Sequence, residues 1–216
     1  NYTGYSNGVL FDTTVEQKAR EAGVFEEDGD YTPKVICVGK QQVIIGLDEA
    51  IIGKEPGFEE TLDIPPEKAF GEHEQELIRS YDKKSFSKKP EIGMRVTIPD
   101  EGTGFVVNTI GNRVIVDFNH PLAGRTLTYS YHIEGIVESA TEKVAGLIKR
   151  YTGIEMETTL EGSTAIVKLP PGIYYTGKTW YNMKPFVTQS IFDNIREIDE
   201  IRYIENYSRT KAGSEE

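Results

Sequence analysis

The chain has 216 residues, enough for one large domain or for two or three small ones; 38% are hydrophobic and 27% charged. Its 24 basic and 35 acidic residues leave a formal net charge of −11, which argues against a nucleic-acid backbone as the main partner. No apolar run reaches the length of a membrane span and no signal-peptide pattern is visible. The single cysteine, Cys37, excludes an internal disulfide, so we expect a protein of the reducing cytoplasm.

The first elements predicted along the chain are a turn and a helix. Asn7-Gly8 is typical of a tight turn, and the apolar residues after it indicate a strand. Thr13 predicts the start of a helix over residues 14–22, and Glu16, three positions later, completes a capping-box pattern.

Two strands and a short helix are expected next. Residues 35–38 form an apolar, β-branched run that predicts a buried strand, with Cys37 as a small core residue. A short helix is predicted at residues 47–50, inside a second apolar stretch. Residues 58–64 place their apolar side chains mostly on one face, which predicts a strand that ends at Pro65-Pro66.

A small all-β unit is predicted in the middle of the chain. Residues 73–90 are polar and rich in lysine, which indicates a solvated loop. Three short strands follow at residues 95–98, 103–110 and 113–118, with Gly111-Asn112 as the hairpin turn between the last two. Such a unit is too short to be stable alone without further support.

Residues 125–137 give the clearest strand pattern in the sequence. Leu127, Tyr129 and Tyr131 fall on one face with Ile133, while His132 falls on the other. We therefore expect His132 to face solvent, and we give it no catalytic role.

A separate unit is expected after residue 138. Ser139 and Glu142 form a second capping-box pattern ahead of a helical apolar stripe that runs from Val144 to Tyr151. Two strands, a helix and a last strand are then predicted, so the order is α-β-β-α-β. These four elements span residues 154–160, 164–169, 185–198 and 201–207, and a disordered polar tail is expected over residues 209–216.

Familiar catalytic constellations are missing from the sequence. His73, His120 and His132 do not combine with Cys37 in any metal-ligand spacing. No P-loop, G-x-S-x-G or G-x-G-x-x-G motif is present. A metal enzyme, a hydrolase and a dehydrogenase would each need residues that the chain lacks, so we expect no cofactor and no metal.

Several short motifs occur in the order found in one enzyme family. They are Tyr2-Thr3-Gly4, Leu10-Phe11-Asp12-Thr13, residues 39–46 (GKQQVIIG) and Ala69-Phe70-Gly71. Together they resemble the signature of the FKBP prolyl isomerases. Residues 119–124 (NHPLAG) are similar to the SlyD-like branch, whose flap carries an inserted domain, and the domain after residue 138 resembles the long archaeal members.

The resemblance implies an α+β fold with an antiparallel half-barrel sheet wrapped on a short helix. The expected domains are the FKBP domain at residues 1–72 plus 120–138, an insert-in-flap chaperone domain at 73–119, and a C-terminal domain at 139–208, followed by the tail at 209–216. Because the family begins with a strand before Tyr2, part of that strand is expected to be missing here.

The resemblance also implies an apolar cup that binds the proline of a polypeptide client, with Leu47 as its floor. The Ile44 amide is expected to hold the client carbonyl. Carried over residue by residue, the cup consists of Tyr2, Phe11, Asp12, Val43, Ile44, Leu47, Phe70, Leu122, Ala123 and Tyr129.

Two departures from the family pattern leave the turnover rate open, but not the fold. Many members carry tyrosine where this chain has Phe70, and that hydroxyl can donate a hydrogen bond worth about 1 kcal/mol. Leu47 replaces a tryptophan of the single-domain relatives, which makes the cup wider or shallower. The histidine-rich metal-binding tail of some SlyD relatives is also absent.

Other interpretations stay open at this stage. Taken singly, Val43, Ile44 and Tyr129 fit any β-core, and Asp12 could support the helix start beside Thr13. The whole protein could be a non-catalytic holdase with a vestigial pocket. A nucleic-acid-binding barrel in the insert is disfavoured by the acidic charge and by the lack of interleaved arginine and aromatic residues. Unfolded polypeptides are the expected partners, with a possible homodimer through the C-terminal domain.

Overall fold

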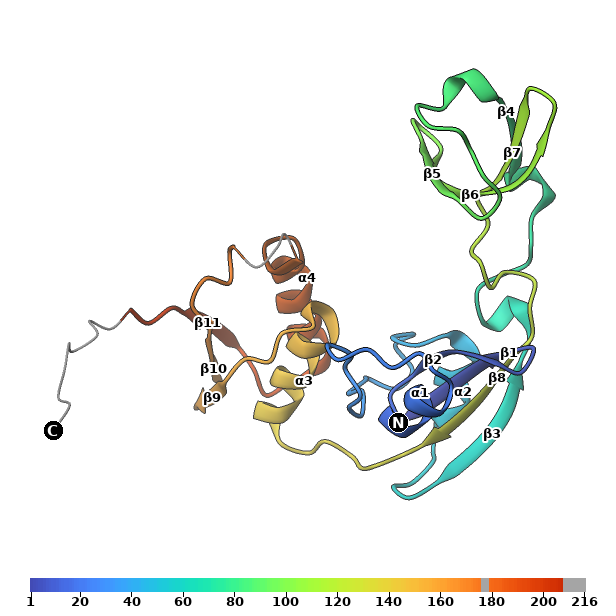
Figure 1. The fold of residues 1–216 in the computed structure, drawn as a ribbon. Coiled ribbons are helices and arrows are strands. Elements are labelled where there is room, and N and C mark those ends of the chain that lie inside the picture. The colour runs from blue at the N-terminus through green and yellow to red at the C-terminus, as the bar shows by residue number, and fades with distance from the viewer. Residues whose placement is uncertain (176–178, 208–216) are drawn as a thin grey trace, which may run out of the picture.

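Three separate β-sheets organise the chain in the computed structural model, which describes residues 1–175 and 179–207. Each sheet has its own cluster of buried apolar side chains, and helices accompany the first and the third. Figure 1 shows the middle sheet of the sequence standing apart from the first, joined to it by two extended segments, while the last sheet lies on another side. The fold class is α+β, as predicted.

The first sheet is antiparallel, with the strand order β2-β1-β8-β3. Its strands are β1 (Tyr2–Ser6), β2 (Val9–Thr13), β3 (Glu59–Ile64) and β8 (Leu127–His132), and helix α2 (Ile45–Ile51) packs against it. The predicted strand at 58–64, the helix around 47–50 and the alternation of β8 are confirmed, although β8 ends at His132. The buried core combines Leu47 and Ile64 with Leu127, Tyr129 and Tyr131.

Two local predictions in the first third of the chain are wrong. Helix α1 spans only Glu16–Glu21, and Val15 rather than Thr13 is its N-cap. Thr13 belongs to β2, and its hydroxyl accepts a hydrogen bond from the Val15 amide at 3.0 Å, so the capping box does not form. Residues 35–38 form no strand; the Cys37 amide donates to the Gln42 side chain at 2.9 Å instead of to a sheet partner.

The insert contains the second sheet, with the order β4-β7-β6-β5. These strands are β4 (Ile78–Asp82), β5 (Arg95–Ile98), β6 (Gly102–Ile110) and β7 (Arg113–Asp117), with 3-10 turns at Pro66–Lys68, Gln75–Leu77 and Lys83–Ser85 around them. The three predicted strands and the turn at Gly111, whose φ is 57°, are confirmed. The prediction of a loop throughout residues 73–90 missed β4, an edge strand whose exposed Arg79 and Ser80 disguise it.

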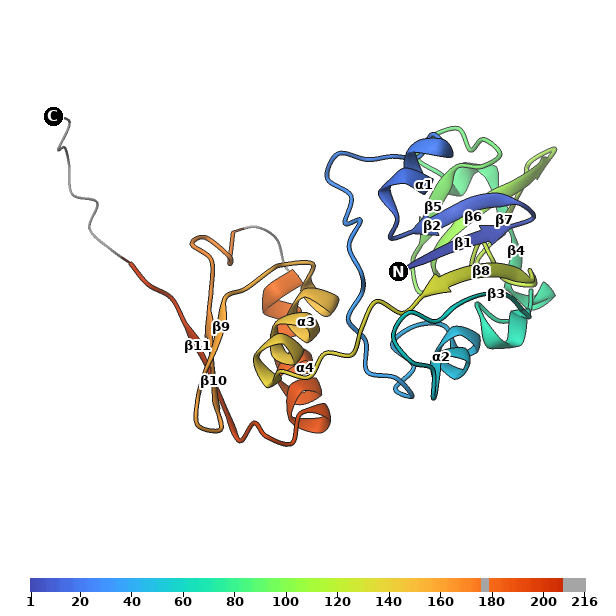
Figure 2. The same cartoon turned by 90° about the horizontal axis from the view of Figure 1, so that it is seen from below.

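The C-terminal unit has the predicted α-β-β-α-β order. Its elements are α3 (Ala140–Thr152), β9 (Thr158–Glu161), β10 (Thr164–Lys168), α4 (Thr179–Asn194) and β11 (Glu200–Ile204). Strand β10 pairs antiparallel with β9 and parallel with β11, and Figure 2 shows both helices on one face of this sheet.

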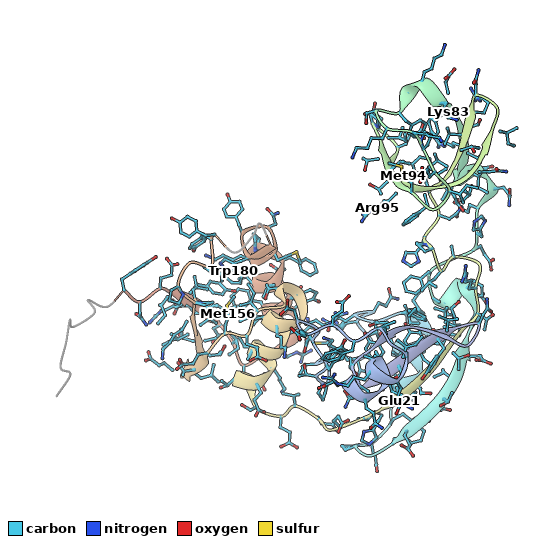
Figure 3. The ribbon with its side chains drawn as sticks, in the orientation of Figure 1. Glu21, Lys83, Met94, Arg95, Met156 and Trp180 are labelled. Atoms are coloured by element: carbon cyan, nitrogen blue, oxygen red, sulfur yellow. The ribbon has the colours of Figure 1, made fainter. Side chains whose placement is uncertain are left out.

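Some details of this unit differ from the predictions. Helix α4 starts six residues before Pro185, which therefore lies inside it, and Ser139 is the N-cap of α3 without a side-chain cap bond. Trp180 is 1% exposed and its ring lies 5.1 Å from that of Tyr203, so Tyr203 belongs to the core. Figure 3 shows Trp180 and Met156 within this domain. The predicted tail at 209–216 lies outside the described residues.

No helix in the described part of the chain is both long enough and apolar enough to span a membrane.

Candidate active site

The side chains predicted for the cup gather where α2 packs on the first sheet. Leu47 and Tyr129 are both only 4% exposed, and they form the buried centre of an apolar cluster. Eight of the ten predicted residues belong to this cluster, and they come from β1, β2, β8, α2 and three connecting loops: Tyr2, Phe11, Val43, Ile44, Leu47, Phe70, Leu122 and Tyr129. Ala123 is buried nearby in the chain but is not part of the cluster, and Asp12 is exposed.

Three aromatic rings form one wall of the cluster. The Tyr129 ring centroid lies 5.9 Å from that of Tyr2, and 5.7 Å from that of Phe11 in an edge-to-face contact. A Cβ at Gly4 would lie 2.7 Å from Phe11 and 3.1 Å from Tyr129, so only glycine lets these rings approach the strand. This wall is rigid and mostly apolar, as a site that excludes water requires.

Asp12 joins this wall through a hydrogen bond. The Tyr2 hydroxyl donates to Asp12 Oδ2 at 2.7 Å. Burial raises the pKa of Tyr2, and the bond to the Asp12 carboxylate raises it further. Asp12 thus orients the Tyr2 ring, and its side chain does not bond to the start of α1.

The loop before α2 presents a free backbone donor. Among the described residues, the Ile44 N–H has no hydrogen-bond acceptor, while the Ile44 carbonyl accepts from Leu47 and Asp48. Asp48 is buried, and its carboxylate accepts the Gly39 amide at 2.9 Å and the Gln41 amide at 2.8 Å. This carboxylate anchors the loop before α2 through these two amides, a role that the sequence analysis missed.

His120 is a second residue of the cluster's border that the sequence analysis did not select. Its ring stacks on Phe70 with centroids 4.1 Å apart and an interplanar angle of 6°. Its Nδ1 accepts the Leu122 amide at 3.1 Å, which ties the loop of residues 119–124 to Phe70. The only signal in the sequence was its place inside the NHPLAG motif.

A cavity between α2 and the C-terminal domain only partly overlaps the cup. This cavity of about 860 Å³ shares Tyr2, Val43 and Leu47 with the cup. Most of its remaining lining comes from residues 33–38 and 133–137 and from the C-terminal domain, and neither Phe70 nor Leu122 lines it. The free Ile44 amide belongs to the apolar cluster, and Ile44 does not line this cavity.

Metal-binding groups are not assembled at this site. Within residues 1–175 and 179–207, no three histidine, cysteine, aspartate or glutamate side chains come close enough together to hold a metal ion.

Three protein families match successive parts of the chain. Residues 1–86 match the FKBP-type peptidyl-prolyl cis-trans isomerases, residues 80–122 match the FKBP26 IF domain, and residues 140–208 match the FKBP26 C-terminal domain. The fold and these matches thus place the chain in the class of FKBP-type prolyl isomerases with a domain inserted in the flap.

Similar curated proteins carry the same enzyme name. A short-type peptidyl-prolyl cis-trans isomerase of Methanocaldococcus jannaschii is 32% identical over 142 residues, which cover 63% of this chain and 88% of that protein. SlyD of Helicobacter pylori is 30% identical over 60% of this chain and 75% of its own length, and SlyD of Treponema pallidum is 34% identical over 52% and 66%. The chain belongs to the FKBP-type peptidyl-prolyl cis-trans isomerase family, so its substrates are polypeptides.

Proposed function

We propose that the apolar cluster between α2 and the first sheet is the catalytic cup and that it isomerises prolyl bonds by desolvation. One observation supports this proposal: eight of the predicted cup residues lie in a single apolar cluster, with Tyr129 and Leu47 at its buried centre. Asp12 supports the cup through Tyr2, and Ala123 supports it from the adjacent loop.

The mechanism follows from the electronic structure of the amide. Resonance opposes rotation about the prolyl bond with a barrier of about 18–20 kcal/mol. The twisted transition state loses that resonance, and its carbonyl is less polar than that of the planar amide. An apolar cup that excludes water therefore binds the twisted form better than the planar form. The free Ile44 N–H can hold a client carbonyl while the bond rotates.

Replacement of Tyr129 tests the assignment of the site. Tyr129→Ala removes the ring that both Tyr2 and Phe11 contact, so kcat/KM on a proline tetrapeptide should fall at least about tenfold. Tyr129→Phe is the matched control, because it keeps the ring and should retain most of the activity. A folded Tyr129→Ala variant with the parent's turnover would show that the site lies elsewhere.

The insert is proposed to be a separate chaperone domain at about residues 73–119, between the two parts of the FKBP domain. Its own core supports this division: Val106, Val114 and Val116 are buried inside it. These three valines therefore belong to the core of the insert and cannot form a surface for clients. The apolar side chains left exposed are Ile92, Val107 and Ile110.

Client binding is proposed at the edge of this sheet. Strand β5 is one of its two edge strands, so backbone groups along one side lack a strand partner among the described residues. An extended, unfolded client can pair with such an edge. Val107 sits at a bulge in β6, beside β5, and adds an exposed apolar side chain near that edge.

The C-terminal domain, at about residues 139–208, is proposed to form a homodimer through an aromatic edge. Tyr175 is 93% exposed and Tyr207 is 83% exposed. Tyr174, next to Tyr175 in the chain, is 50% exposed and adds a further aromatic ring. A second copy of the chain could cover them, because aromatic residues are enriched in protein interfaces.

The open face of the C-terminal sheet is a poorer candidate for this contact. Arg202 and Glu200 form an ion pair there at 3.0 Å, and Lys168 pairs with Glu157 beside it. Ile166 pairs across the sheet with Thr159 and Arg202, so its surroundings are polar.

A further inference from the structure

We infer that the C-terminal domain helps to build the prolyl site, with Arg150 and Tyr151 of α3 as positioning residues that act through Gln42. Gln42 directly precedes Val43 and Ile44, which line the cup in the proposed function on which this inference rests. Arg150 and Tyr151 would act on the cup indirectly, since both donate to or accept from Gln42.

Gln42 is bound on three sides. Its Oε1 accepts the Cys37 amide at 2.9 Å, and its Nε2 donates to the Tyr151 hydroxyl at 2.8 Å. The Arg150 guanidinium donates through Nη2 to the Gln42 carbonyl oxygen. Two of these three bonds come from a helix more than 100 residues away in the sequence. The Gln42 backbone and side chain are therefore both fixed by the C-terminal domain.

The segment before Gln42 also lies against α3. A Cβ at Gly146 would lie only 2.7 Å from Val35 Cγ1, so the helix and this segment are in close contact. Lys149 Nζ donates to Thr32 Oγ1 at 3.1 Å and lies 3.5 Å from the Asp30 carboxylate. Figure 2 shows the segment after α1 running between the first sheet and the C-terminal helices.

The Arg150 side chain has a geometry that stability alone does not explain. Its Nε is buried and has no hydrogen-bond partner among the described residues. Burying an unpaired donor is unfavourable. The positive charge of Arg150 also opposes the increase in the pKa of Tyr2 that burial and Asp12 cause, so the guanidinium lies within electrostatic reach of the cup wall.

The loop that carries the Ile44 amide is thus held from two directions. Asp48 of α2 accepts the amides of Gly39 and Gln41 on one side. Arg150 and Tyr151 hold Gln42 on the other side. Because pre-organised donors contribute more to catalysis than mobile ones, loss of the second contact should weaken the hold on the client carbonyl.

A double-mutant cycle in the full chain separates positioning from general stability. Tyr151→Phe removes only the hydroxyl that Gln42 contacts, and Gln42→Ala removes the other partner. We expect each to lower kcat/KM for a proline tetrapeptide about two- to fivefold, with no further loss when both are combined. Additive losses, or no loss from either, would contradict the inference.

The positioning role of Arg150 is tested with a conservative substitution to lysine and with a control substitution at another arginine of the same domain. Arg150→Ala should lower kcat/KM about three- to tenfold, while Arg150→Lys should recover part of that loss because lysine keeps one donor. Arg196→Ala, an exposed arginine of the same domain, should leave the activity unchanged.

The amide resonance of Ile44 supplies a direct readout. It should shift in Arg150→Ala, whereas the Val116 amide in the insert should not change. An unchanged Ile44 resonance together with parental kcat/KM overturns the positioning role. If Tyr129→Ala in the same assay also keeps the parent's activity, the cup assignment has failed; if Tyr129→Ala is inactive, only the role of Arg150 has failed.

Discussion

Phe70 is the cup position at which the family resemblance implies tyrosine in many members. In this chain, its ring is held against His120 at the border of the apolar cluster. The ring therefore lacks a hydroxyl that could donate to a client carbonyl, while its position is fixed by stacking. The residue contributes apolar area to the proposed cup and no polar contact.

We predict that Phe70→Tyr raises activity. One additional hydrogen bond to the client carbonyl in the transition state contributes about 1 kcal/mol, so kcat/KM on a proline tetrapeptide should increase about threefold to fivefold. Phe86→Tyr, which adds the same hydroxyl in the core of the insert, is the control and should not change activity on this short substrate. Equal effects of both substitutions would argue against a role for the Phe70 position.

At the scale of single residues, sequence reasoning succeeded where a local pattern carried the information. The alternation of residues 127–131 predicted the buried faces of Leu127, Tyr129 and Tyr131. The pairing of Gln42 with Tyr151 depends on contacts between residues 109 positions apart, and no local pattern reports such contacts. Asp48 was missed for a related reason: its two acceptor bonds arise from a loop conformation that the sequence does not reveal.

The two segments that join the insert to the FKBP sheet are locked together by a polar network. The Asn119 amide group bonds both backbone groups of Glu74 at 2.9 Å. Asp117 accepts from Asn119 and lies 2.9 Å from His73 Nε2. Burial alone would raise the pKa of Asp117, but the bonds from Asn119 and His73 outweigh it and hold the pKa below its ordinary value of 3.8.

We predict that this lock weakens in acid. Because the folded pKa of Asp117 is depressed, its contribution to stability is complete above 3.8 and is lost as the pH falls through the lowered value. Asp117→Asn should lower the free energy of unfolding at neutral pH, and its difference from the parent should shrink as the pH falls below about 4. Urea unfolding followed over this range measures it. Asp82→Asn is the control, and a difference that stays constant with pH would contradict the prediction.

The insert also yields a prediction as a whole element. Replacing about residues 74–119 with a short loop removes the proposed client-binding edge while leaving the apolar cluster in place. Catalysis on a tetrapeptide should remain nearly intact, whereas catalysis of a proline-limited refolding protein should weaken greatly. Both rates are measured with the same preparation. Equal losses on the two substrates would contradict the division of labour between cup and insert.

At the scale of elements, the sequence predicted most strands because apolar and polar residues alternate in them. Strand β4 was not predicted, because it lies at an edge of its sheet and exposes two polar residues, Arg79 and Ser80. Both capping boxes failed because the motif needs side-chain geometry as well as spacing: Thr13 is held in β2, and Ser139 makes no cap bond. Helix α4 begins at Thr179, six residues before the predicted start at 185, and contains Pro185.

At the scale of the whole molecule, the C-terminal domain lies beside the FKBP domain, and the insert extends away from that domain (Figure 1). The family resemblance predicted these units and their order. The contacts between these units could not be predicted from the sequence. The close approach of Val35 to Gly146 and the bonds to Gln42 join segments that lie far apart in the chain and share no sequence pattern. A dimer would present two inserts to one client and raise the effective concentration of binding edges.

The proposed dimer gives the last prediction. At tens of micromolar, the full chain should sediment as a dimer, and a chain ending at Glu138 should sediment as a monomer. Replacing Tyr175 and Tyr207 together with aspartate should yield monomers, since it places charges in the two most exposed rings of the aromatic edge. Thr159→Lys, on the open face of the sheet, is the matched control and should leave the dimer intact. Monomers from Thr159→Lys together with dimers from the tyrosine variant would assign the interface to the sheet face instead, and a monomeric parent would exclude a dimer at these concentrations.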